Sequence, residues 1–373
     1  MFLGIDVSTY FEEKEAGAKY YINHKEVDPI EVFKNQGVSY MRIRVWHNPR
    51  DNEGHPYLAG TNDIKEFERL SRLAVEHGMH IILDIHYSDF WADPGKQFTP
   101  KAWEGLSFEE IKKCVYEHTK DIFKVINKNH FPVDMVQVGN EITNGMIWPY
   151  GKLDDSTNPR GNYENLAALL KEGIRAVKEE SNAKIIIHLE KSYDQATYDE
   201  YLSHIIKYGV EFDYVGMSYY PYWHGTFDQL FANVNMVQKK FKKEVIVIEL
   251  GYGFTNYDYV LDENGQPRKL NEDDSGLNYL GQPMPYPITE EGQASFIRDF
   301  LKKAKENNLA GVCYWEPLWL PGPGMCWASK YAQIYLHEKV IVEDARNEWA
   351  NQCFYDYHGN ALPSLKEFKI DDK

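Results

Sequence analysis

The sequence predicts a single (β/α)8 barrel, an α/β fold in which parallel strands alternate with helices. Three observations support this prediction. Eight short apolar segments recur along the chain, and amphipathic segments lie between them. No G-x-G-x-x-G pattern follows the first apolar segment, which argues against an open dinucleotide-binding sheet. A chain of 373 residues suits one barrel with extended loops, so we expect one domain over residues 1–373.

The candidate strands are short and rich in Ile and Val. They are residues 2–8 (FLGIDVS), 40–46 (YMRIRVW), 80–87 (HIILDIHY), 134–141 (DMVQVGNE), 184–190 (KIIIHLE), 213–220 (DYVGMSYY), 244–250 (EVIVIEL) and 311–317 (GVCYWEP). Such nearly continuous apolar runs are typical of parallel strands that are covered on both faces. Eight of them favour a closed barrel over an open, doubly wound sheet.

Three of the intervening segments show helical periodicity most clearly, at residues 62–78, 164–180 and 289–308. The first ends at Gly78, a common residue just beyond a helix end. The last opens on Thr289 and continues with two glutamates, which suits an N-cap and the helix dipole.

Two connections are long. Residues 251–288 follow the seventh strand, and residues 317 to about 345 follow the eighth. Both leave the carboxyl end of a strand, the face at which barrels carry their active sites. Long ordered loops there predict a binding site.

The charge balance excludes several classes of partner. The chain has 41 Lys and Arg against 57 Asp and Glu, a net charge of −16. Nucleic acid and anionic membranes attract the opposite sign, so we expect neither as a partner. No apolar run approaches the ~20 residues of a membrane-spanning helix. We expect a monomer.

The opening MFLGIDVSTY shows no signal peptide, and none of the four cysteines forms a C-x-x-C pair. A reduced cytoplasmic protein is the simplest interpretation. A trimmed, mature form of a secreted protein would have the same sequence features.

Polar and ionisable residues stand at the ends of most candidate strands. They are Asp6, Arg44, Asp84, His86, Asn140, Glu141, Glu190, Tyr219, Tyr220, Glu249 and Glu316. Glu249 closes a run without any other polar residue, VIVIE, and Glu141 closes MVQVGNE in a similar way. The fourth and seventh strands face each other across a barrel mouth. Two glutamates placed there are what carboxylate-pair glycoside hydrolysis needs.

The tryptophans favour a carbohydrate ligand. Seven lie at or shortly after a strand end: Trp46, Trp91, Trp148, Trp223, Trp315, Trp319 and Trp327. Indole faces match the apolar C–H faces of sugar rings. We expect two or three to pack beneath the loops and the others to line a groove. Trp91, Trp148 and at least one of Trp223, Trp319 and Trp327 should border the groove that holds the glutamates.

Several blocks also resemble a known family. They are RIRVWHNP (42–49), HYSDFWADPGKQFTPKAW (86–103), GNEITNGMIWPYG (139–151), SYYPYWHG (218–225), YPITEEGQASF (286–296), YWEP (314–317) and WANQCFYDYHGNALPSL (349–365). Together they resemble glycoside hydrolase family 53, the endo-β-1,4-galactanases that cut the galactan side chains of pectin. The blocks keep the family's order and span nearly the whole chain.

The resemblance implies a retaining glycosidase that acts on β-1,4-galactan or galacto-oligosaccharides. By it, Glu141 is the general acid/base, Glu249 the nucleophile, and Asn140 the partner of the sugar 2-hydroxyl. Further substrate-binding positions match Arg44, His86, Tyr219 and Trp315 of the clan pattern, and Asp89, Trp91, Trp148 and His224 around the cleft. Two close carboxylates repel a second ionisation, so we expect the shared proton to sit on Glu141.

The loop after the seventh strand departs from the family pattern, because ELGYGFTNYDYV replaces its usual threonine and Tyr-Pro pair. Many bacterial members hold calcium in this region. Here DENGQP offers Asp262 and Asn264, but Gln266 stands where a calcium loop needs Asp or Asn. We expect no cofactor, with calcium in this loop as the alternative.

Four other functions occur on barrels or carbohydrate-binding proteins of this kind. A metal-dependent barrel hydrolase would carry His-x-His on the first strand, which has Asp6 and no His. A phosphate site would stand next to Glu249, which repels it. A non-catalytic carbohydrate-binding protein would lack one of the two glutamates. A mannanase or glucanase of the same clan stays open, because fold cannot exclude it. A closed pocket would indicate exo action on short oligosaccharides.

Overall fold

The computed structural model describes residues 1–153, 161–270, 276–336 and 346–370. Eight parallel strands close into a barrel in the order β1-β14-β11-β10-β9-β6-β5-β4. Their bounds are β1 Phe2–Asp6, β4 Tyr40–Val45, β5 His80–Ile85, β6 Val133–Val138, β9 Lys184–Leu189, β10 Tyr214–Tyr219, β11 Glu244–Leu250 and β14 Gly311–Tyr314. Seven of these strands lie within a predicted segment, and β6 begins one residue before its predicted segment. The predicted barrel is therefore confirmed.

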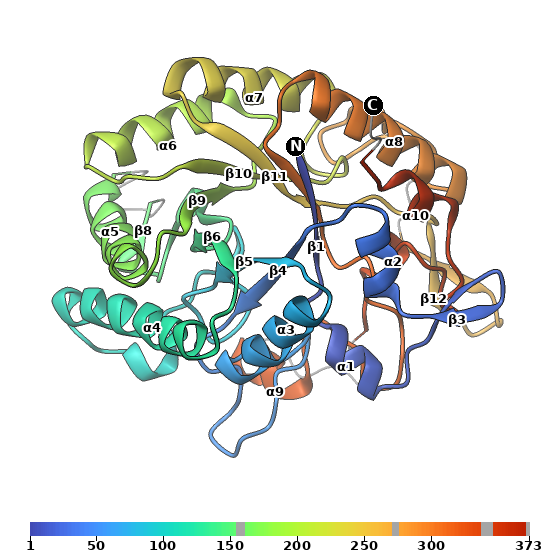
Figure 1. Cartoon of the computed structure of the whole chain (residues 1–373), viewed down its shortest axis with the longest axis horizontal. Coiled ribbons are helices and arrows are strands. Elements are labelled where there is room, and N and C mark those ends of the chain that lie inside the picture. The colour runs from blue at the N-terminus through green and yellow to red at the C-terminus, as the bar shows by residue number, and fades with distance from the viewer. Residues whose placement is uncertain (154–160, 271–275, 337–345, 371–373) are drawn as a thin grey trace.

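Helices form a ring around the strands (Figure 1). They are α1 Tyr10–Glu15, α2 Pro29–Asn35, α3 Ile64–Glu76, α4 Phe108–Asn129, α5 Tyr163–Glu180, α6 Gln195–Lys207, α7 Phe227–Phe241, α8 Glu290–Glu306, α9 Lys330–Tyr335 and α10 Pro363–Glu367. The three predicted helices correspond to α3, α5 and α8. As expected, the Thr289 side chain caps α8 by accepting a hydrogen bond from the Gly292 N–H.

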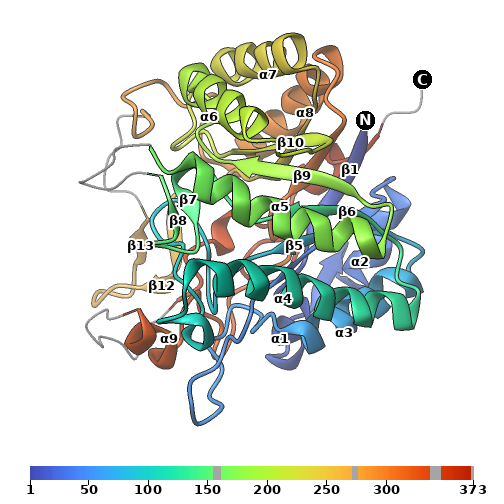
Figure 2. The ribbon, with the colours of Figure 1, turned by 90° about the vertical axis from the view of Figure 1, so that its left-hand side faces the viewer.

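Short hairpins decorate the loops between these elements. They are β2 Tyr20–Ile22 with β3 Lys25–Val27, β7 Gly145–Met146 with β8 Gly151–Lys152, and β12 Tyr257–Leu261 with β13 Pro267–Lys269. Figure 2 places the last two hairpins and α9 at the end of the barrel opposite both termini. Because they follow strand ends, they build up the face predicted to carry the site. Residues 271–275 and 337–345 of the two long connections lie outside the described residues.

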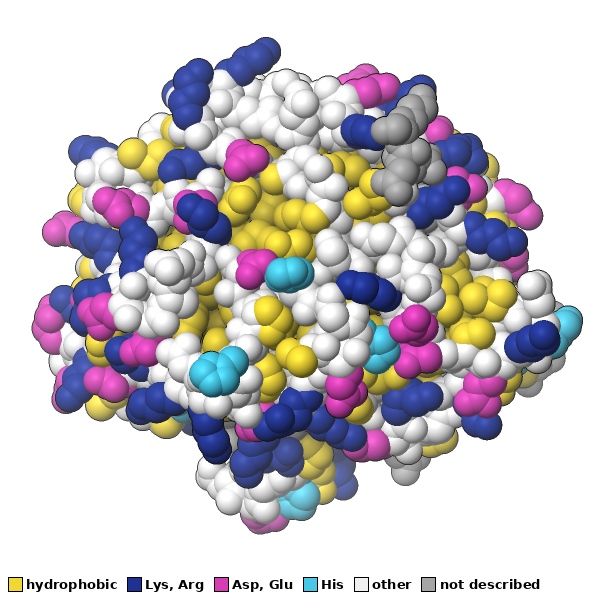
Figure 3. Space-filling model, in the orientation of Figure 1, with side chains coloured by type: hydrophobic (Ala, Val, Ile, Leu, Met, Phe, Trp, Pro, Cys, Tyr) yellow, Lys and Arg dark blue, Asp and Glu magenta, His cyan; other side chains and the backbone are white. Residues whose placement is uncertain are grey.

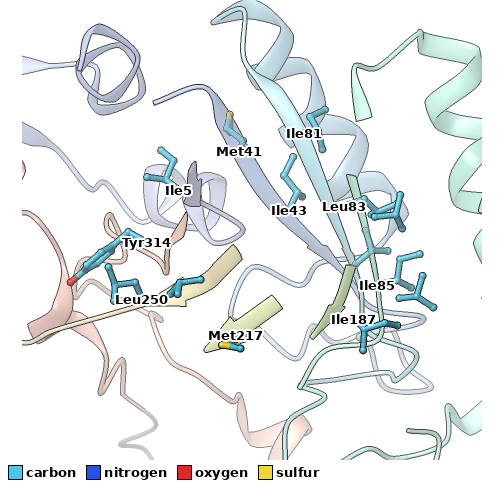
Figure 4. Packing of buried hydrophobic residues seen from close by; sticks show 14 of the residues in the cluster. Ile5, Met41, Ile43, Ile81, Leu83, Ile85, Ile187, Met217, Leu250 and Tyr314 are labelled. Carbon is cyan, nitrogen blue, oxygen red and sulfur yellow. The ribbon is translucent and has the colours of Figure 1, made fainter. Parts of the chain in front are cut away.

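The core has two layers, which follow from the alternation of side chains along each strand. Side chains that point outward, such as Ile81, Leu83 and Ile85, pack between the barrel and the helices (Figure 4). Those that point inward fill the barrel near the strand starts. This inner layer contains Ile82, Met135, Ile186, Ile246, Ile248 and Cys313. Above it the inward positions become polar, and there the site begins.

A β-bulge in β11 interrupts this alternation. Met217 of β10 pairs with Val247, but the next residue, Ser218, pairs with Glu249, so Ile248 is skipped. Val247 and Leu250 both pack toward the helices. In a strand with a regular two-residue period, Glu249 would point outward as Val247 does. The bulge instead turns Glu249 into the barrel mouth, a common use of bulges beside active sites.

The face that carries both termini shows acidic and basic side chains interspersed around its rim (Figure 3). The negative net charge is therefore not gathered into one patch on this side. Among the described residues, no helix has the length and apolar character needed to cross a membrane.

Candidate active site

A cavity of about 550 Å³ opens at the carboxyl ends of the strands. Its walls combine ionisable and aromatic side chains from most of the barrel. Among them are Arg42, Arg44, Asp84, His86, Trp91, Asn140, Glu141, Glu190, Tyr220, Trp223, His224, Glu249, Trp315, Trp327 and Trp349. The position agrees with the rule that barrels place functional groups at this end.

Glu141 and Glu249 meet in this cavity. A carboxylate oxygen of Glu141 lies within 4.8 Å of a carboxylate oxygen of Glu249. Glu141, three residues beyond the end of β6, has left-handed backbone with φ +46°. A glutamate adopts this region at a cost, and such strain is concentrated at functional sites. Retaining glycosidases hold their two carboxyl groups about 5–5.5 Å apart, and a wider gap leaves room for the water of inverting enzymes. The observed spacing fits the retaining class.

Glu249 is held by a cation and a hydroxyl. Arg42 Nη1 lies 3.0 Å from one carboxylate oxygen, and the Tyr220 hydroxyl donates to the other over 2.9 Å. Arg42 also contacts Asp6 at 3.0 Å and Asp84 at 2.8 Å, all of them buried. One guanidinium thus organises three carboxylates beneath the cavity.

Glu141 has a different environment. Its Oε1 lies 2.6 Å from Ser218 Oγ, and within the described residues no lysine or arginine forms an ion pair with it. Burial and the charges of Glu249 and Glu190 raise the pKa of Glu141 well above its usual range. Burial also raises the pKa of Glu249, to about 7, although Arg42 opposes this shift. The pair therefore holds one proton near neutral pH, and Glu141 is the better place for it.

Arg44, His86, Trp91 and Trp315 all line the cavity. Arg44 pairs with Glu316 at 2.6 Å and with Asp6 at 3.3 Å. Its guanidinium lies 4.3 Å from the centre of the Trp91 ring. These contacts hold the Trp91 ring in place at the cavity wall.

Asn140 and His224 also line the cavity. The side-chain oxygen of Asn140, Oδ1, accepts from Arg42 Nη2 and from Gln137 Nε2, each at 2.9 Å. Its amide nitrogen donates to the Ala92 carbonyl at 2.8 Å. Nδ1 of His224 accepts from the Tyr220 N–H at 3.1 Å. Both side chains are thus locked in place at the cavity wall.

The prediction for Tyr219 is wrong by one residue. Tyr219 points outward, where it packs against Phe296 and Phe300 and donates to the Gly225 carbonyl. Tyr220 faces the cavity instead and contacts Glu249. The two-residue period of the strand, counted from the inward Ser218, explains the difference.

Asp89 does not reach the cavity either. It is fully buried and accepts hydrogen bonds from the backbone N–H groups of Asn48 (3.0 Å) and Lys101 (2.8 Å). A carboxylate committed to backbone donors joins the loops after β4 and β5. Its role is to shape the wall rather than to touch a ligand.

Trp148 lies in a separate depression, together with Thr99, Lys101 and Tyr335. The backbone N–H of Trp148 donates to the Gln97 carbonyl at 2.6 Å, and the Thr99 hydroxyl donates to the Trp148 backbone carbonyl at 2.7 Å. This pairing fixes the loop away from the glutamates. The prediction that Trp148 borders their groove is wrong.

The other tryptophans divide as expected. The cavity is lined by Trp91, Trp223, Trp315 and Trp327. Trp349, which lies beyond the long connection after β14, also lines it. Trp46 and Trp319 are fully buried. They support the aromatic wall from behind, since Trp46 packs against Trp91 and Trp319 against Trp315.

Sequence reasoning missed Arg42, Ser218 and His188. Arg42 lies two residues before Arg44 on the same strand, so the two-residue period places both inside the barrel. The same period could have predicted His188, two residues before Glu190. Ser218 stands before the tyrosine pair and gave no chemical signal of its own.

The calcium alternative finds little support in the described residues. Asp262, Asn264 and Gln266 form the turn of the β12–β13 hairpin. The Asp262 carboxylate accepts from the N–H groups of Asn264 (2.9 Å) and Gln266 (2.8 Å). Only one of the three residues carries a carboxylate, and its Oδ1 accepts both turn hydrogen bonds, so these residues do not fit a calcium site that needs six or more oxygen ligands.

The tyrosine pair offers a matched test of this geometry. Tyr220→Phe removes a donor to Glu249, and we expect kcat/KM to fall about 10–100-fold. Tyr219→Phe deletes the same atom on the other side of the strand and should cost about 1 kcal/mol of stability with little loss of activity. Steady-state kinetics and urea unfolding of both variants check this. A larger kinetic loss in Tyr219→Phe would contradict the assignment.

Comparison with known proteins agrees with this geometry. The family model described as glycosyl hydrolase family 53 matches residues 2–368. A Bacillus subtilis endo-beta-1,4-galactanase is 35% identical over 98% of this chain and 85% of its own. An Aspergillus niger arabinogalactan endo-beta-1,4-galactanase A is 29% identical over 85% of each chain.

Solved structures show the same relationship. The Ignisphaera aggregans GH53 catalytic domain superimposes with a TM-score of 0.83 and 35% identity, over 98% of this chain and 95% of that one. A fungal beta-1,4-galactanase gives a TM-score of 0.76 at 25% identity, over 99% and 98% of the two chains. With the family model covering nearly all of its length, this chain is a glycoside hydrolase of family 53.

Proposed function

We propose that this enzyme is an endo-β-1,4-galactanase that cleaves with retention of anomeric configuration. The spacing of Glu141 and Glu249 carries the mechanistic part, since one oxygen of each lies within 4.8 Å of the other. The substrate part rests on relatives named as galactanases, one of them 35% identical over 98% of this chain. The substrate class is β-1,4-galactan or galacto-oligosaccharides.

In the first step, Glu249 attacks the anomeric carbon while Glu141 protonates the leaving oxygen. Arg42 and Tyr220 orient the Glu249 carboxylate and stabilise its charge before attack. The bond to the leaving sugar breaks, its oxygen gains the proton, and a glycosyl–enzyme ester forms on Glu249.

In the second step, Glu141 is ionised and removes a proton from water, which attacks the same carbon. Its pKa should fall after the first step, because the ester removes the negative charge of Glu249 that had raised it. The released sugar keeps its configuration, and the proton returns to Glu141.

An endo mode agrees with the shape of the cleft. The cavity shares Trp223, Glu348 and Trp349 with a neighbouring depression of about 300 Å³. The walls therefore continue past the glutamates on that side. A polymer needs such continuation, whereas a closed pocket would suit exo action.

Product analysis tests this proposal. The purified enzyme is incubated with linear β-1,4-galactan, mannan, xylan and β-glucan, and the reducing ends and product lengths are measured. We expect reducing ends from galactan alone, with a mixture of oligosaccharides early in the reaction. Release of only one short product from chain ends would contradict endo action, and faster cleavage of mannan or glucan would overturn the substrate.

A further inference from the structure

A continuous chain of hydrogen bonds joins Glu141 to the arginine beneath Glu249. Glu141 Oε1 lies 2.6 Å from Ser218 Oγ, which lies 2.8 Å from His188 Nε2. His188 Nδ1 lies 2.9 Å from the side-chain oxygen of Asn140, Oδ1. Arg42 donates to that same oxygen at 2.9 Å. His188 and Ser218 are fully buried, so these contacts are shielded from bulk water.

The direction of the hydrogen bonds along this chain follows from counting donors and acceptors, beginning at the Asn140 side chain. Its amide nitrogen donates to the Ala92 carbonyl at 2.8 Å, and its oxygen accepts from Arg42, so the orientation of the amide is fixed. An amide oxygen can only accept. This 2.9 Å contact needs a proton, which His188 Nδ1 supplies as a third donor to an oxygen that also accepts from Arg42 Nη2 and Gln137 Nε2. The Glu141 N–H also approaches Nδ1, but at 3.4 Å, where a hydrogen bond gains little.

A neutral imidazole carries one N–H, so Nε2 of His188 then has a lone pair toward Ser218. Burial and the charge of Arg42 lower the pKa of His188 well below its usual value, which keeps the ring neutral. The Ser218 hydroxyl has a single proton and gives it to Nε2. Its oxygen can then only accept from Glu141, and the proton of that 2.6 Å contact belongs to the carboxyl group.

We propose that His188 and Ser218 are positioning residues that hold the catalytic proton on Glu141 through this directed hydrogen-bond chain. This inference rests on the proposed function, in which Glu141 is the acid. A hydrogen bond made by the protonated form favours that form, so the chain loads the acid before substrate arrives. Once Glu141 has given its proton to the leaving oxygen, Ser218 must turn to donate to the new carboxylate. When water returns a proton to Glu141, the first arrangement is restored.

Other ionisable groups act on the two ends of this hydrogen-bond chain. Glu249 on β11, Glu190 after β9 and Asp93 in the loop after β5 act on Glu141. Those that act on His188 are Arg42 on β4, Asp84 and His86 at the end of β5, and His224 after β10. A variant should leave all of these in place. Ser218→Ala does so, because it deletes one uncharged oxygen.

The test is the alkaline limb of kcat/KM against pH on a galacto-oligosaccharide, which reports the acid in the free enzyme. We expect Ser218→Ala to move this limb down by about one pH unit. The opposite arrangement, in which Ser218 donates to an ionised Glu141, predicts an upward move. An upward move or an unchanged limb would overturn the proposal.

Ser192→Ala is the matched control. Ser192 is as buried as Ser218 and donates to the Ser218 carbonyl at 2.7 Å, but it lies outside the chain to Glu141. Its alkaline limb should match that of the unmodified enzyme. An equal shift in both variants would show that loosening of β10 causes the effect, and would overturn the role of Ser218.

A spectroscopic measurement on the unmodified enzyme is independent of any folding defect. Nitrogen-15 NMR of histidine-labelled protein, with the His188 signals assigned through His188→Gln, should show a neutral ring protonated at Nδ1. A ring protonated at Nε2 would overturn the chain direction. Should Glu141 itself prove not to be the acid, azide rescue of Glu141→Ala would fail, and that result would separate failure of the proposed function from failure of the chain.

Discussion

Replacing Glu249 by alanine is expected to lower kcat on galactan by at least about 10⁴-fold, because no glycosyl–enzyme can form without its nucleophile. An activated leaving group should not help, since the missing group is the one that attacks carbon. Rates on galactan and on an aryl β-galactoside measure this. Glu348→Gln removes an exposed carboxylate from the rim of the same cavity and serves as the control, with a small effect expected.

Glu141→Ala should behave differently on the two substrates. Galactan cleavage should also be nearly abolished, because its leaving oxygen needs a proton. An aryl leaving group needs little protonation, so the first step should survive and the intermediate should accumulate. A burst of aryl release followed by slow turnover is the expected time course. Equal losses of kcat/KM on both substrates would contradict the role of Glu141 as acid.

Arg42→Met is expected to have the second large effect, on stability as well as on rate. Arg42 is buried with Asp6, Asp84 and Glu249 around it. Methionine matches much of its length but leaves these carboxylates without a cation. Breaking a buried ion pair in this way costs about 3–5 kcal/mol. Loss of the cation that orients Glu249 should lower kcat about 10²–10³-fold.

The stability loss should depend on pH. Burial raises the pKa of Asp84, but Arg42 and His86 bring it below its ordinary value. A depressed carboxyl pKa stabilises the fold above the unfolded pKa, and that contribution disappears as pH falls through the folded pKa. The variant lacks the contribution, so its deficit should be larger at about pH 8 than at about pH 4, where its carboxyl groups take up protons.

Urea unfolding of Arg42→Met at both pH values measures this difference. The control is Arg69→Met, which breaks an exposed pair with Glu15 and should cost about 1 kcal/mol or less. A deficit of Arg42→Met that is equal at both pH values would contradict an electrostatic origin.

The sequence was sufficient to predict the barrel, because its strands are short apolar runs whose period and number leave few other folds. It also predicted the two glutamates, because Glu249 closes an apolar run and Glu141 closes a mostly apolar one. Both kinds of signal are local. They need no knowledge of how a strand is rotated or paired.

The remaining details of the site depend on rotation and pairing. Tyr219 and Tyr220 are chemically alike at a strand end, and the strand period alone decides which one reaches Glu249. The bulge at Ile248 turns Glu249 inward against that same period. Trp148 was misplaced because its loop pairs with residues 97–99, a contact between distant segments that local patterns do not encode.

The anomeric configuration of azide products tests the central claim most directly. Azide should restore turnover of an aryl β-galactoside by Glu141→Ala and give the β-galactosyl azide, because it attacks the glycosyl–enzyme formed on Glu249. With Glu249→Ala, azide should attack the substrate itself and give the α-azide. Proton NMR of the two products distinguishes them. The reverse pattern, α from Glu141→Ala and β from Glu249→Ala, would exchange the roles of the two glutamates and contradict the mechanism proposed for this enzyme.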